Sequence, residues 1–265
     1  MRPNKYPGKF IVLEGPEGGG KSTQAKLLAE RMKKEECPVF LTKEPTSDGV
    51  FGQLVRFIYE CRSKFEKIPE ALEKCMKSKE YELMAAMASE ARKRHILRFE
   101  NVVQEIRKGN HTNLDMLIQL GMTFDGLDHA ERVYIPELGK GVNVITDRWR
   151  FSTLAYGAGS GLNWKELWIA QEEILWDNFI RPDLVLFIDV PTEIGHKRTL
   201  KKQGGHEEYF DKPDRMEKIR HAYLEILHDR FIKNQFTVET IDGSEPEEKV
   251  HEKIWKIVKP IVKTE

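Results

Sequence analysis

A glycine-rich stretch near the N-terminus has the composition of a phosphate-binding loop. Residues 15–23 read GPEGGGKST, and the fixed positions of the pattern G-x-x-x-x-G-K-S fall on Gly15, Gly20, Lys21 and Ser22. Glycines let backbone N–H groups turn toward a phosphate, the lysine reaches the outer phosphates, the serine hydroxyl can bind Mg²⁺, and the following helix adds its positive end. The stretch therefore predicts binding of a nucleoside triphosphate by Gly15, Pro16, Glu17, Gly18, Gly19, Gly20, Lys21, Ser22 and Thr23.

Further polar residues follow two other apolar runs of the chain. Lys43-Glu44-Pro45 comes after one run, and Asp147-Arg148 comes after another, with residues 152–156 close behind. An arginine at such a position can bind a phosphate through two hydrogen bonds, or it can pair with a carboxylate on a neighbouring loop. Beside a phosphate-binding loop, Arg148 is predicted to bind a phosphate.

Short apolar runs alternate with longer amphipathic stretches along the chain, which predicts a parallel sheet flanked by helices. The predicted strands are residues 9–13, 38–42, 142–146 and 184–190, with a fifth at 236–241. Ligands of open α/β sheets bind at the carboxyl ends of the strands, where these polar residues would meet.

The alternation is interrupted between residues 59 and 113. Apolar residues recur there at spacings near three or four, which predicts two charged amphipathic helices. Two roles remain open for this inserted helical segment. It would serve either as a lid or packing element, or as a subunit contact or specificity arm.

Composition limits the partners and the compartment. The chain has 265 residues, with 43 basic and 43 acidic side chains, so its net charge attracts neither nucleic acid nor a membrane surface, and neither is expected as a partner. Cys37, Cys61 and Cys75 lack metal-type spacing and predict reduced thiols, hence a cytoplasmic protein. No apolar run has the length of a membrane span or a signal peptide, and a single domain of residues 1–265 is expected.

An ordered set of motifs resembles the thymidylate kinase family, and its archaeal branch most closely. The motifs are the glycine loop with Ser22-Thr23-Gln24, then Thr42-Lys43-Glu44-Pro45-Thr46, Asp147-Arg148 with Ser152 and Ala155-Tyr156, Arg181-Pro182-Asp183 with Ile188-Asp189-Val190-Pro191, and Ala222-Tyr223-Leu224. The resemblance implies a P-loop kinase α/β fold of three layers, with a five-stranded parallel sheet, helices on both faces and the inserted segment 59–113. It also implies Mg²⁺-dependent transfer of the ATP γ-phosphoryl group to dTMP, and a homodimer.

Such an acceptor explains why no convincing general base stands out in the sequence. A nucleoside monophosphate has its second pKa near 6, so its attacking oxygen is already largely deprotonated at neutral pH. Positioning and charge neutralisation are what the site must supply.

The resemblance assigns roles residue by residue. It implies acceptor binding by Glu17, Arg56, Met122, Arg148, Thr153 and Tyr156, metal binding by Ser22 and Asp147, and catalytic roles for Lys21, Arg148 and Arg198. Glu17 would face the 3′-hydroxyl of the acceptor, and Tyr156 would cover the 2′ face of its sugar. Plainer roles stay open, as a solvent-facing loop acid for Glu17 and a core tyrosine for Tyr156.

Three positions depart from the family pattern around the base. Met122 and Gly126 stand where a phenylalanine that stacks on thymine and an arginine that binds its O4 are usual, and Gly157 stands where a glutamine is frequent. Losing a hydrogen-bond donor weakens discrimination between bases, so dUMP or another pyrimidine monophosphate remains an alternative acceptor. A shifted register would instead bring Phe124 to the base.

The source of positive charge for the transfer also departs from the family. The loop carries no arginine, so the lid, expected at residues 198–215, should supply one, yet Glu208 stands at an arginine's place. Arg198 is predicted to contact the ATP phosphates, with Lys201 or Lys202 in support, and a slow enzyme is expected. Ile241-Asp242-Gly243-Ser244 resembles a loop beside the adenine, although a simple turn would look the same. A regulatory nucleotide-binding protein without kinase activity is the remaining alternative.

Overall fold

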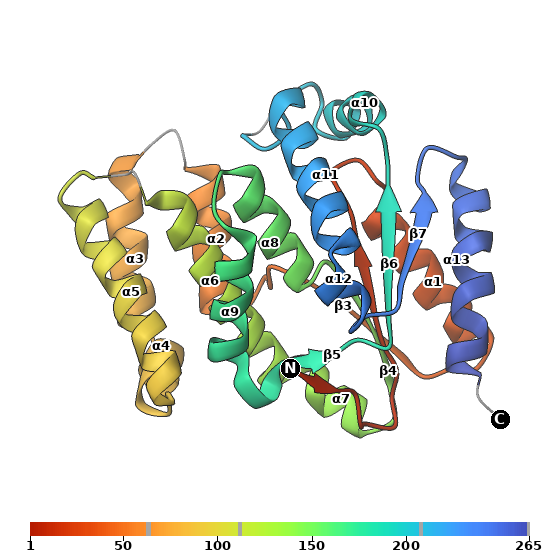
Figure 1. The fold of residues 1–265 in the computed structure, drawn as a ribbon, viewed down its shortest axis with the longest axis horizontal. Coiled ribbons are helices and arrows are strands. Elements are labelled where there is room, and N and C mark those ends of the chain that lie inside the picture. The colour runs from red at the N-terminus through yellow and green to blue at the C-terminus, as the bar shows by residue number, and fades with distance from the viewer. Residues whose placement is uncertain (62–64, 111–112, 207–208, 264–265) are drawn as a thin grey trace.

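The computed structural model describes residues 1–61, 65–110, 113–206 and 209–263. Its centre is a five-stranded parallel sheet in the order β3-β4-β2-β6-β7 (Figure 1), as predicted. The strands are β2 (Phe10–Glu14), β3 (Val39–Lys43), β4 (Asn143–Asp147), β6 (Leu184–Asp189) and β7 (Val238–Asp242). A two-residue strand, β1 (Arg2–Pro3), pairs with β5 (Ile180–Arg181) outside this sheet.

The first three strands of the chain's central sheet begin and end one residue later than their apolar runs predict. Their last residues, Glu14, Lys43 and Asp147, are charged but still pair across the sheet, Lys43 with Asp147 and Glu14 with Phe187. A run of apolar residues does not predict where such a strand ends, because the backbone hydrogen bonds between strands do not depend on the side chain.

Successive residues of the central strand supply two separate cores. Phe10 and Val12 of β2 belong to the larger core, with α6 (Leu114–His129), α8 (Arg150–Gly159) and α11 (Pro213–His228). Ile11 and Leu13 belong to the smaller core, which α1 (Lys21–Lys34) and α13 (Glu247–Val262) cover. This alternation gives the predicted three layers, with helices on both faces of the sheet.

Other helices, apart from those of segment 59–113, extend the layers at their edges. They are α2 (Val50–Glu60), α7 (Ile135–Gly139), α9 (Trp164–Leu175), α10 (Thr192–Lys202) and α12 (Arg230–Lys233), together with the short turns η1 (Phe65–Lys67), η2 (Ala130–Tyr134) and η3 (Trp176–Asn178). Helix α10 directly follows β6 and lies above the carboxyl ends of the strands in Figure 1.

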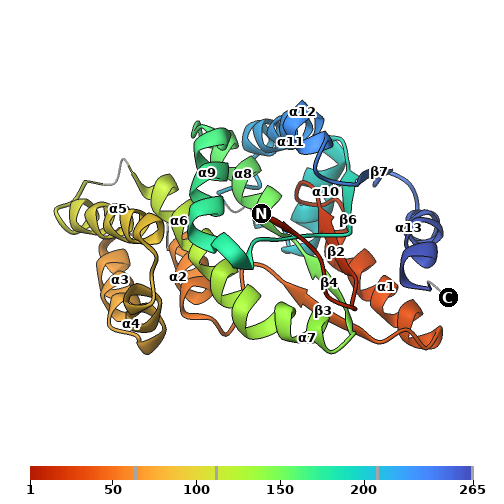
Figure 2. The ribbon, with the colours of Figure 1, turned by 60° about the horizontal axis from the view of Figure 1, so that its bottom comes forward.

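The described part of segment 59–113 forms three α-helices where two were predicted. They are α3 (Ile68–Met76), α4 (Lys79–Ala86) and α5 (Glu90–Arg107), and they lie at the end of the molecule far from α13 (Figure 2). Ser78 and Ser89 cap α4 and α5, since their hydroxyls accept hydrogen bonds from the backbone N–H groups of Tyr81 and Arg92. The apolar spacing continues across these caps, so periodicity alone merged separate helices. Helices α3 and α5 bury apolar side chains in the larger core beside α2 and α6.

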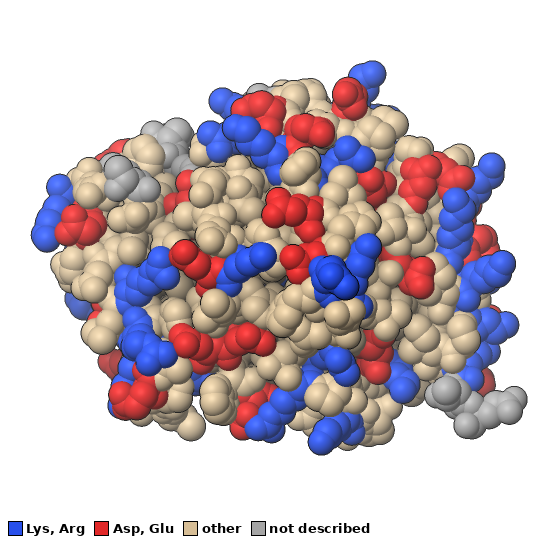
Figure 3. Space-filling view, viewed as in Figure 1, with Lys and Arg blue, Asp and Glu red and all other residues tan. Residues whose placement is uncertain are grey.

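The surface shows no dominant sign of charge on the face seen in Figure 3. Lys and Arg side chains are interspersed there with Asp and Glu side chains. Within the described ranges, none of the helices has the length and apolar composition that crossing a membrane requires.

Candidate active site

The glycine loop joins β2 to α1 and is held in a shape that only glycine readily adopts. Gly15, Gly18 and Gly20 all have positive φ angles, of 146°, 72° and 88°. A Cβ atom at Gly18 would lie 2.2 Å from the carbonyl oxygen of Gly195. These glycines therefore keep the loop against α10 while Gly20 turns the chain into the N-terminus of α1.

Lys21 begins α1 and is buried under the loop that it follows. Its Nζ atom donates a hydrogen bond to the carbonyl oxygen of Pro16 at 2.7 Å. Burial, together with the nearby charge of Arg148, lowers the pKa of Lys21 to about 8. The ammonium group is thus mostly charged at neutral pH and loses its proton more readily than an exposed lysine does.

Two adjoining cavities meet at this loop. The first has a volume of about 380 Å³, and it is lined by all six predicted acceptor-binding residues, Glu17, Arg56, Met122, Arg148, Thr153 and Tyr156. The second is lined by residues 17–24 of the loop and α1, by Arg198 and Lys202 of α10, and by Gly243 after β7. Both cavities share Glu17, Lys21 and Ser22. The phosphate-binding groups therefore lie between two sites, each of a size that suits a small ligand.

Arg148 lies directly after β4 and crosses toward the glycine loop. Its φ angle of 74° is unusual for a residue other than glycine. Its guanidinium pairs with the Glu17 carboxylate and donates hydrogen bonds to Tyr156 Oη at 3.1 Å and to Ser152 Oγ at 3.3 Å. The bend in the backbone thus directs the guanidinium to the point where the two cavities meet.

Glu17 and Tyr156 complete a cluster with Arg148. The Tyr156 hydroxyl donates a hydrogen bond to Glu17 Oε1 at 3.0 Å. Burial acts to raise the pKa of Glu17, but Arg148 and Lys21 outweigh it and lower that pKa to about 2. Burial likewise acts to lower the pKa of Arg148, and Glu17 and Tyr156 raise it well above its usual value. Both side chains are therefore charged at neutral pH, and the arginine is held in place by the carboxylate.

Glu14, the last residue of β2, supports this cluster through hydrogen bonds. It was not identified from the sequence. It is fully buried, and it accepts hydrogen bonds from the backbone N–H groups of Trp149 and Ser152, from Ser152 Oγ at 2.6 Å and from Tyr223 Oη at 3.0 Å. Burial raises the pKa of its carboxyl group. An acid directly before the first loop glycine was the available signal, because a charged residue at the end of a buried strand needs such partners.

Ser22 and Asp147 fit a magnesium site. The Ser22 hydroxyl donates a hydrogen bond to Asp147 Oδ2, while Asp147 Oδ1 is buried without a hydrogen-bond partner among the described residues. The part of the chain that the structure describes contains no group of three or more His, Cys, Asp or Glu side chains that could hold a metal ion. Mg²⁺ takes oxygen ligands and commonly uses one or two protein groups beside substrate phosphates, so this sparse set suits it.

Two further predicted arginines lie at opposite sides of the loop. The Arg56 guanidinium donates hydrogen bonds to the carbonyl oxygens of Pro45 and Thr46, and the residue lines both cavities. Arg198 donates to the carbonyl oxygen of Gly243 at 2.6 Å and lines only the second cavity of the two. Arg56 thus lies where both cavities can be reached, and Arg198 lies at the second cavity beside the predicted adenine loop.

The segment predicted as the lid covers the first cavity with aromatic groups. Phe210 packs edge-to-face against Tyr156 and Tyr59, with ring centroids 5.2 Å apart in each pair. Lys202 lines the second cavity, and its charge contributes to lowering the pKa of Glu17. Glu208, the residue at the family's arginine position, lies outside the described residues.

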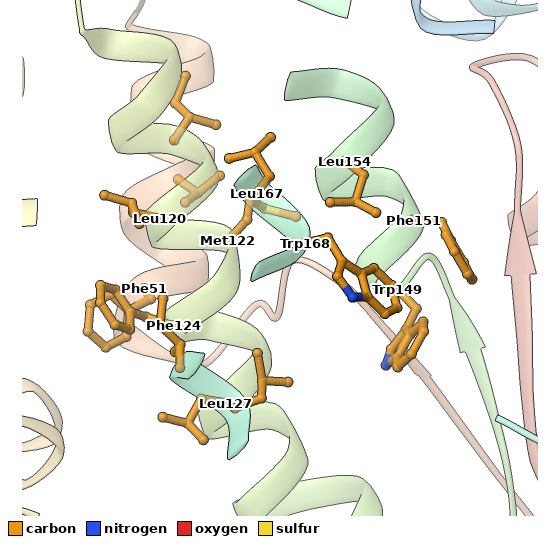
Figure 4. Close-up of a cluster of buried hydrophobic side chains, with 14 of the residues drawn as sticks. Phe51, Leu120, Met122, Phe124, Leu127, Trp149, Phe151, Leu154, Leu167 and Trp168 are labelled. Atoms are coloured by element: carbon orange, nitrogen blue, oxygen red, sulfur yellow. The ribbon is translucent and has the colours of Figure 1, made fainter. Parts of the chain in front are cut away.

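Met122 and Phe124 point to different parts of the core. Met122 lines the first cavity, whereas Phe124 is fully buried and packs 5.3 Å from the ring of Phe51 (Figure 4). The alternative register that brings Phe124 to the base is therefore wrong, because that side chain faces α2 and α5.

Gly126 leaves space for an arginine from another helix. A Cβ atom at Gly126 would lie 1.7 Å from Nη1 of Arg150, which is completely buried. Arg150 pairs with Glu44 and donates a hydrogen bond to the carbonyl oxygen of Met122 at 3.3 Å. Within the described chain, it is not among the residues that line the first cavity. Arg150 consequently lies behind the residues that line this cavity.

Gln119 lines the first cavity and was also missed from the sequence. It lies one turn before Met122 on α6 and is 1 % exposed. A buried glutamine within an apolar helix was the only available signal, and many such residues are structural.

The comparisons with known proteins agree with this geometry. A family model described as thymidylate kinase matches in two overlapping segments, residues 13–97 and 82–254. A probable thymidylate kinase of Pyrococcus abyssi is 31% identical over 252 residues, covering 95% of this chain and 96% of that protein. A probable thymidylate kinase of Thermococcus kodakarensis is 31% identical over 255 residues, covering 96% of this chain and 98% of the relative. A thymidylate kinase of Desulfotalea psychrophila is 28% identical over 215 residues, covering 80% and 79%. With a glycine loop between two cavities and this extent of similarity, the chain belongs to the thymidylate kinase family.

Proposed function

We propose that this protein transfers the γ-phosphoryl group of ATP to dTMP, giving ADP and dTDP, with Mg²⁺ as cofactor. The observation that carries the proposal is the pair of adjoining cavities that share Glu17, Lys21 and Ser22. A donor and an acceptor bound on either side of the loop would bring their phosphates together. Such positioning is the main requirement for phosphoryl transfer.

On the donor side, the loop holds the triphosphate and Lys21 neutralises its outer phosphates. Ser22 and Asp147 would hold Mg²⁺, which supplies positive charge to the phosphates when it is bound. Arg198 lines the same cavity as the glycine loop and would contact the ATP phosphates, and its hydrogen bonds to the carbonyl oxygens of Gly243 and Gly18 hold the loop after β7 beside it.

On the acceptor side, Arg56 and Arg148 bind the monophosphate. Because the acceptor oxygen is already largely deprotonated at neutral pH, no residue has to remove a proton from it. Glu17 keeps Arg148 extended toward the phosphates, and the Tyr156 ring would cover the 2′ face of the sugar. The charged residues thus orient the acceptor and offset the charge of two phosphate groups at close range.

We propose that residues 198–215 form a lid over both sites. Phe210 already contacts Tyr156 at the first cavity, and Lys202 lies at the second. Closure of this segment would exclude water and bring Lys202 toward the transferred group, in place of the arginine that the loop lacks.

We also propose that the protein is a cytoplasmic homodimer. The three cysteines are free in the described residues, which suits a reducing compartment. The homodimer follows from the family resemblance alone, and segment 59–113 is the part of the chain that would alter the subunit contact.

The proposal is tested by measuring dTDP formation directly, with purified protein, ATP, Mg²⁺ and dTMP. We expect dTDP and ADP in equal amounts, and loss of both products in Lys21→Ala. Lys33→Ala, which removes an exposed lysine from the same helix, should match the unchanged protein. Equal ADP release with and without dTMP would contradict the proposal.

A further inference from the structure

One end of the acceptor cavity contains polar atoms that the fold leaves without partners. Neither Oε1 nor Nε2 of Gln119 has a hydrogen-bond partner within the described residues, and the same holds for Oγ1 of Thr153. Both side chains are 1 % exposed, and both line the first cavity. Buried amides and hydroxyls nearly always have partners, so unpaired ones in a cavity require an explanation.

The position of Gln119 connects it to the acceptor. Gln119 and Met122 are three residues apart on α6 and so share a face, as Thr153 and Tyr156 do on α8. All four line the same cavity, and Tyr156 also contacts Arg148 at its phosphate-binding end. The end with Gln119 therefore lies beyond the sugar position, where the base of a bound nucleotide would be.

Gly157 makes room for the Gln119 side chain. A Cβ atom at Gly157 would lie 3.2 Å from Cγ and 3.5 Å from Cδ of Gln119, and 2.4 Å from Cδ1 of Leu167. Gly157 is the position where the family frequently has a glutamine. In this chain, the Gln119 side chain of α6 occupies the space next to Gly157 of α8.

We propose that Gln119 is a specificity-determining residue that binds the hydrogen-bonding edge of the acceptor pyrimidine; this inference rests on the proposed function. The ring of thymine presents a carbonyl acceptor beside an N–H donor on this edge. A carboxamide matches such a pair, because Nε2 donates to the carbonyl oxygen while Oε1 accepts from the N–H group. An arginine at position 126 could have supplied only the donor of this pair, because a guanidinium has no hydrogen-bond acceptor.

The same arrangement explains why Arg150 does not take that role. Its Nη1 and Nη2 groups are engaged by the Met122 carbonyl oxygen and by Glu44, inside the wall of the cavity, and its Nε group is buried without a partner among the described residues. Gln119 has both polar groups free to bind a ligand among the described residues, and it lies one turn from Met122, which would pack on the base.

The test compares two acceptors in one protein preparation. One is dTMP, and the other is its isostere with a 2,4-difluorotoluene ring, which keeps the shape of thymine but has no N–H donor and only weak acceptors. Gln119→Leu removes both polar atoms at similar size. We expect the ratio of kcat/KM for dTMP to kcat/KM for the isostere to fall about tenfold or more, since a buried edge loses its partners.

A ratio is independent of the fraction of correctly folded enzyme, so partial misfolding of the variant does not obscure the result. If Gln119→Leu is inactive toward both acceptors, Gln119→Met provides the same comparison with a flexible side chain. Gln171→Leu is the matched control, because Gln171 is also buried with an unpaired Oε1 in the described structure but its Nε2 binds the carbonyl oxygen of Arg150. Its ratio should stay unchanged.

The outcomes separate the two proposals. No acceptor-dependent turnover in the unchanged protein would contradict the proposed function itself. Normal turnover with dTMP, but an equal loss of kcat/KM for both acceptors in Gln119→Leu, would overturn the role of Gln119 in reading the base and make it a structural residue.

Discussion

The guanidinium of Arg150 occupies the space that a side chain at Gly126 would need. The two residues belong to facing helices, α8 and α6, and only 1.7 Å would separate Nη1 of Arg150 from a Cβ atom at position 126. The arginine is held there by Glu44, with both side chains fully buried. The absence of a side chain at position 126, which looked in the sequence like a simple loss of a base-binding group, is thus part of how the cavity wall is built.

Gly126→Ala is expected to destabilise the protein. The Arg150 guanidinium could make room only by leaving the buried carboxylate of Glu44, and such strain in a packed interior typically costs about 1–3 kcal/mol. Chemical denaturation of the variant measures the change in the free energy of unfolding. Gly139→Ala is the control, because its Cβ would lie 4.0 Å from the nearest atom outside its own helix, Cδ1 of Tyr6. Equal stability of the two variants would show that Arg150 does not constrain position 126.

Arg148→Lys should impair turnover although it keeps the positive charge. A lysine cannot contact the acceptor phosphate, Glu17 and Tyr156 with a planar fork of donors. We expect kcat/KM for dTMP to fall by about 10²-fold, with little change in KM for ATP. The matched control is Arg220→Lys, since Arg220 makes a two-point contact with Asp189 at 2.8 and 2.9 Å away from the acceptor cavity. The assigned role is wrong if both variants retain the same kcat/KM for dTMP.

The pH dependence of kcat/KM for ATP should show a limb near pH 8. Lys21 has its pKa lowered to about 8, chiefly by burial, so it is charged below that pH and neutral above it. Because the charged form binds phosphates, we expect kcat/KM for ATP to decline as the pH rises through about 8. Measurement at saturating dTMP over pH 6 to 10 checks this. A flat profile to pH 10 would mean that Lys21 stays charged in the enzyme–dTMP complex or does not bind the phosphates.

The decline of kcat/KM for dTMP at acid pH should follow the second pKa of the acceptor phosphate. We expect kcat/KM for dTMP to fall below about pH 6, because protonation of the phosphate removes the attacking oxygen's charge. If an enzyme base caused this decline instead, the decline would occur at the pKa of that base. It would then occur at the same pH for acceptors with more acidic phosphates. Thiophosphate analogues of dTMP, which have a lower second pKa, should shift the limb to lower pH.

The protein should elute as a homodimer. Size-exclusion chromatography with light scattering is expected to give twice the mass of one chain, independent of concentration in the micromolar range. A mass of one chain at these concentrations would contradict the homodimer.

The sheet and the phosphate-binding loop were predictable because both depend on local sequence. The apolar runs located every strand of the central sheet, and glycine spacing located the loop. Periodicity failed in segment 59–113, where Ser78 and Ser89 begin new helices as N-caps without interrupting the apolar pattern. Propensity and spacing report on neighbours in the chain, and a capped break between two helices of similar pattern leaves only a weak local signal.

Residues that act through distant contacts were the ones that the sequence did not reveal. Glu14, Gln119 and Arg150 acquire their roles from partners far along the chain, such as Tyr223 for Glu14 and Glu44 for Arg150. By contrast, Arg148 and Tyr156 were predicted from ordered motifs, and the structure brings them into contact with Glu17. The position of Phe124 needed the structure too, because a buried helix has apolar residues on every side.

Whether this protein phosphorylates dTMP is decided by measuring ADP formation with a panel of acceptors at equal concentration, in the presence of ATP and Mg²⁺. The acceptors are dTMP, dUMP, dCMP, dGMP, UMP and CMP. We predict turnover that depends on the acceptor, with the highest kcat/KM for dTMP. A protein that releases no additional ADP with any of these monophosphates, or one that prefers a purine acceptor, would contradict the account.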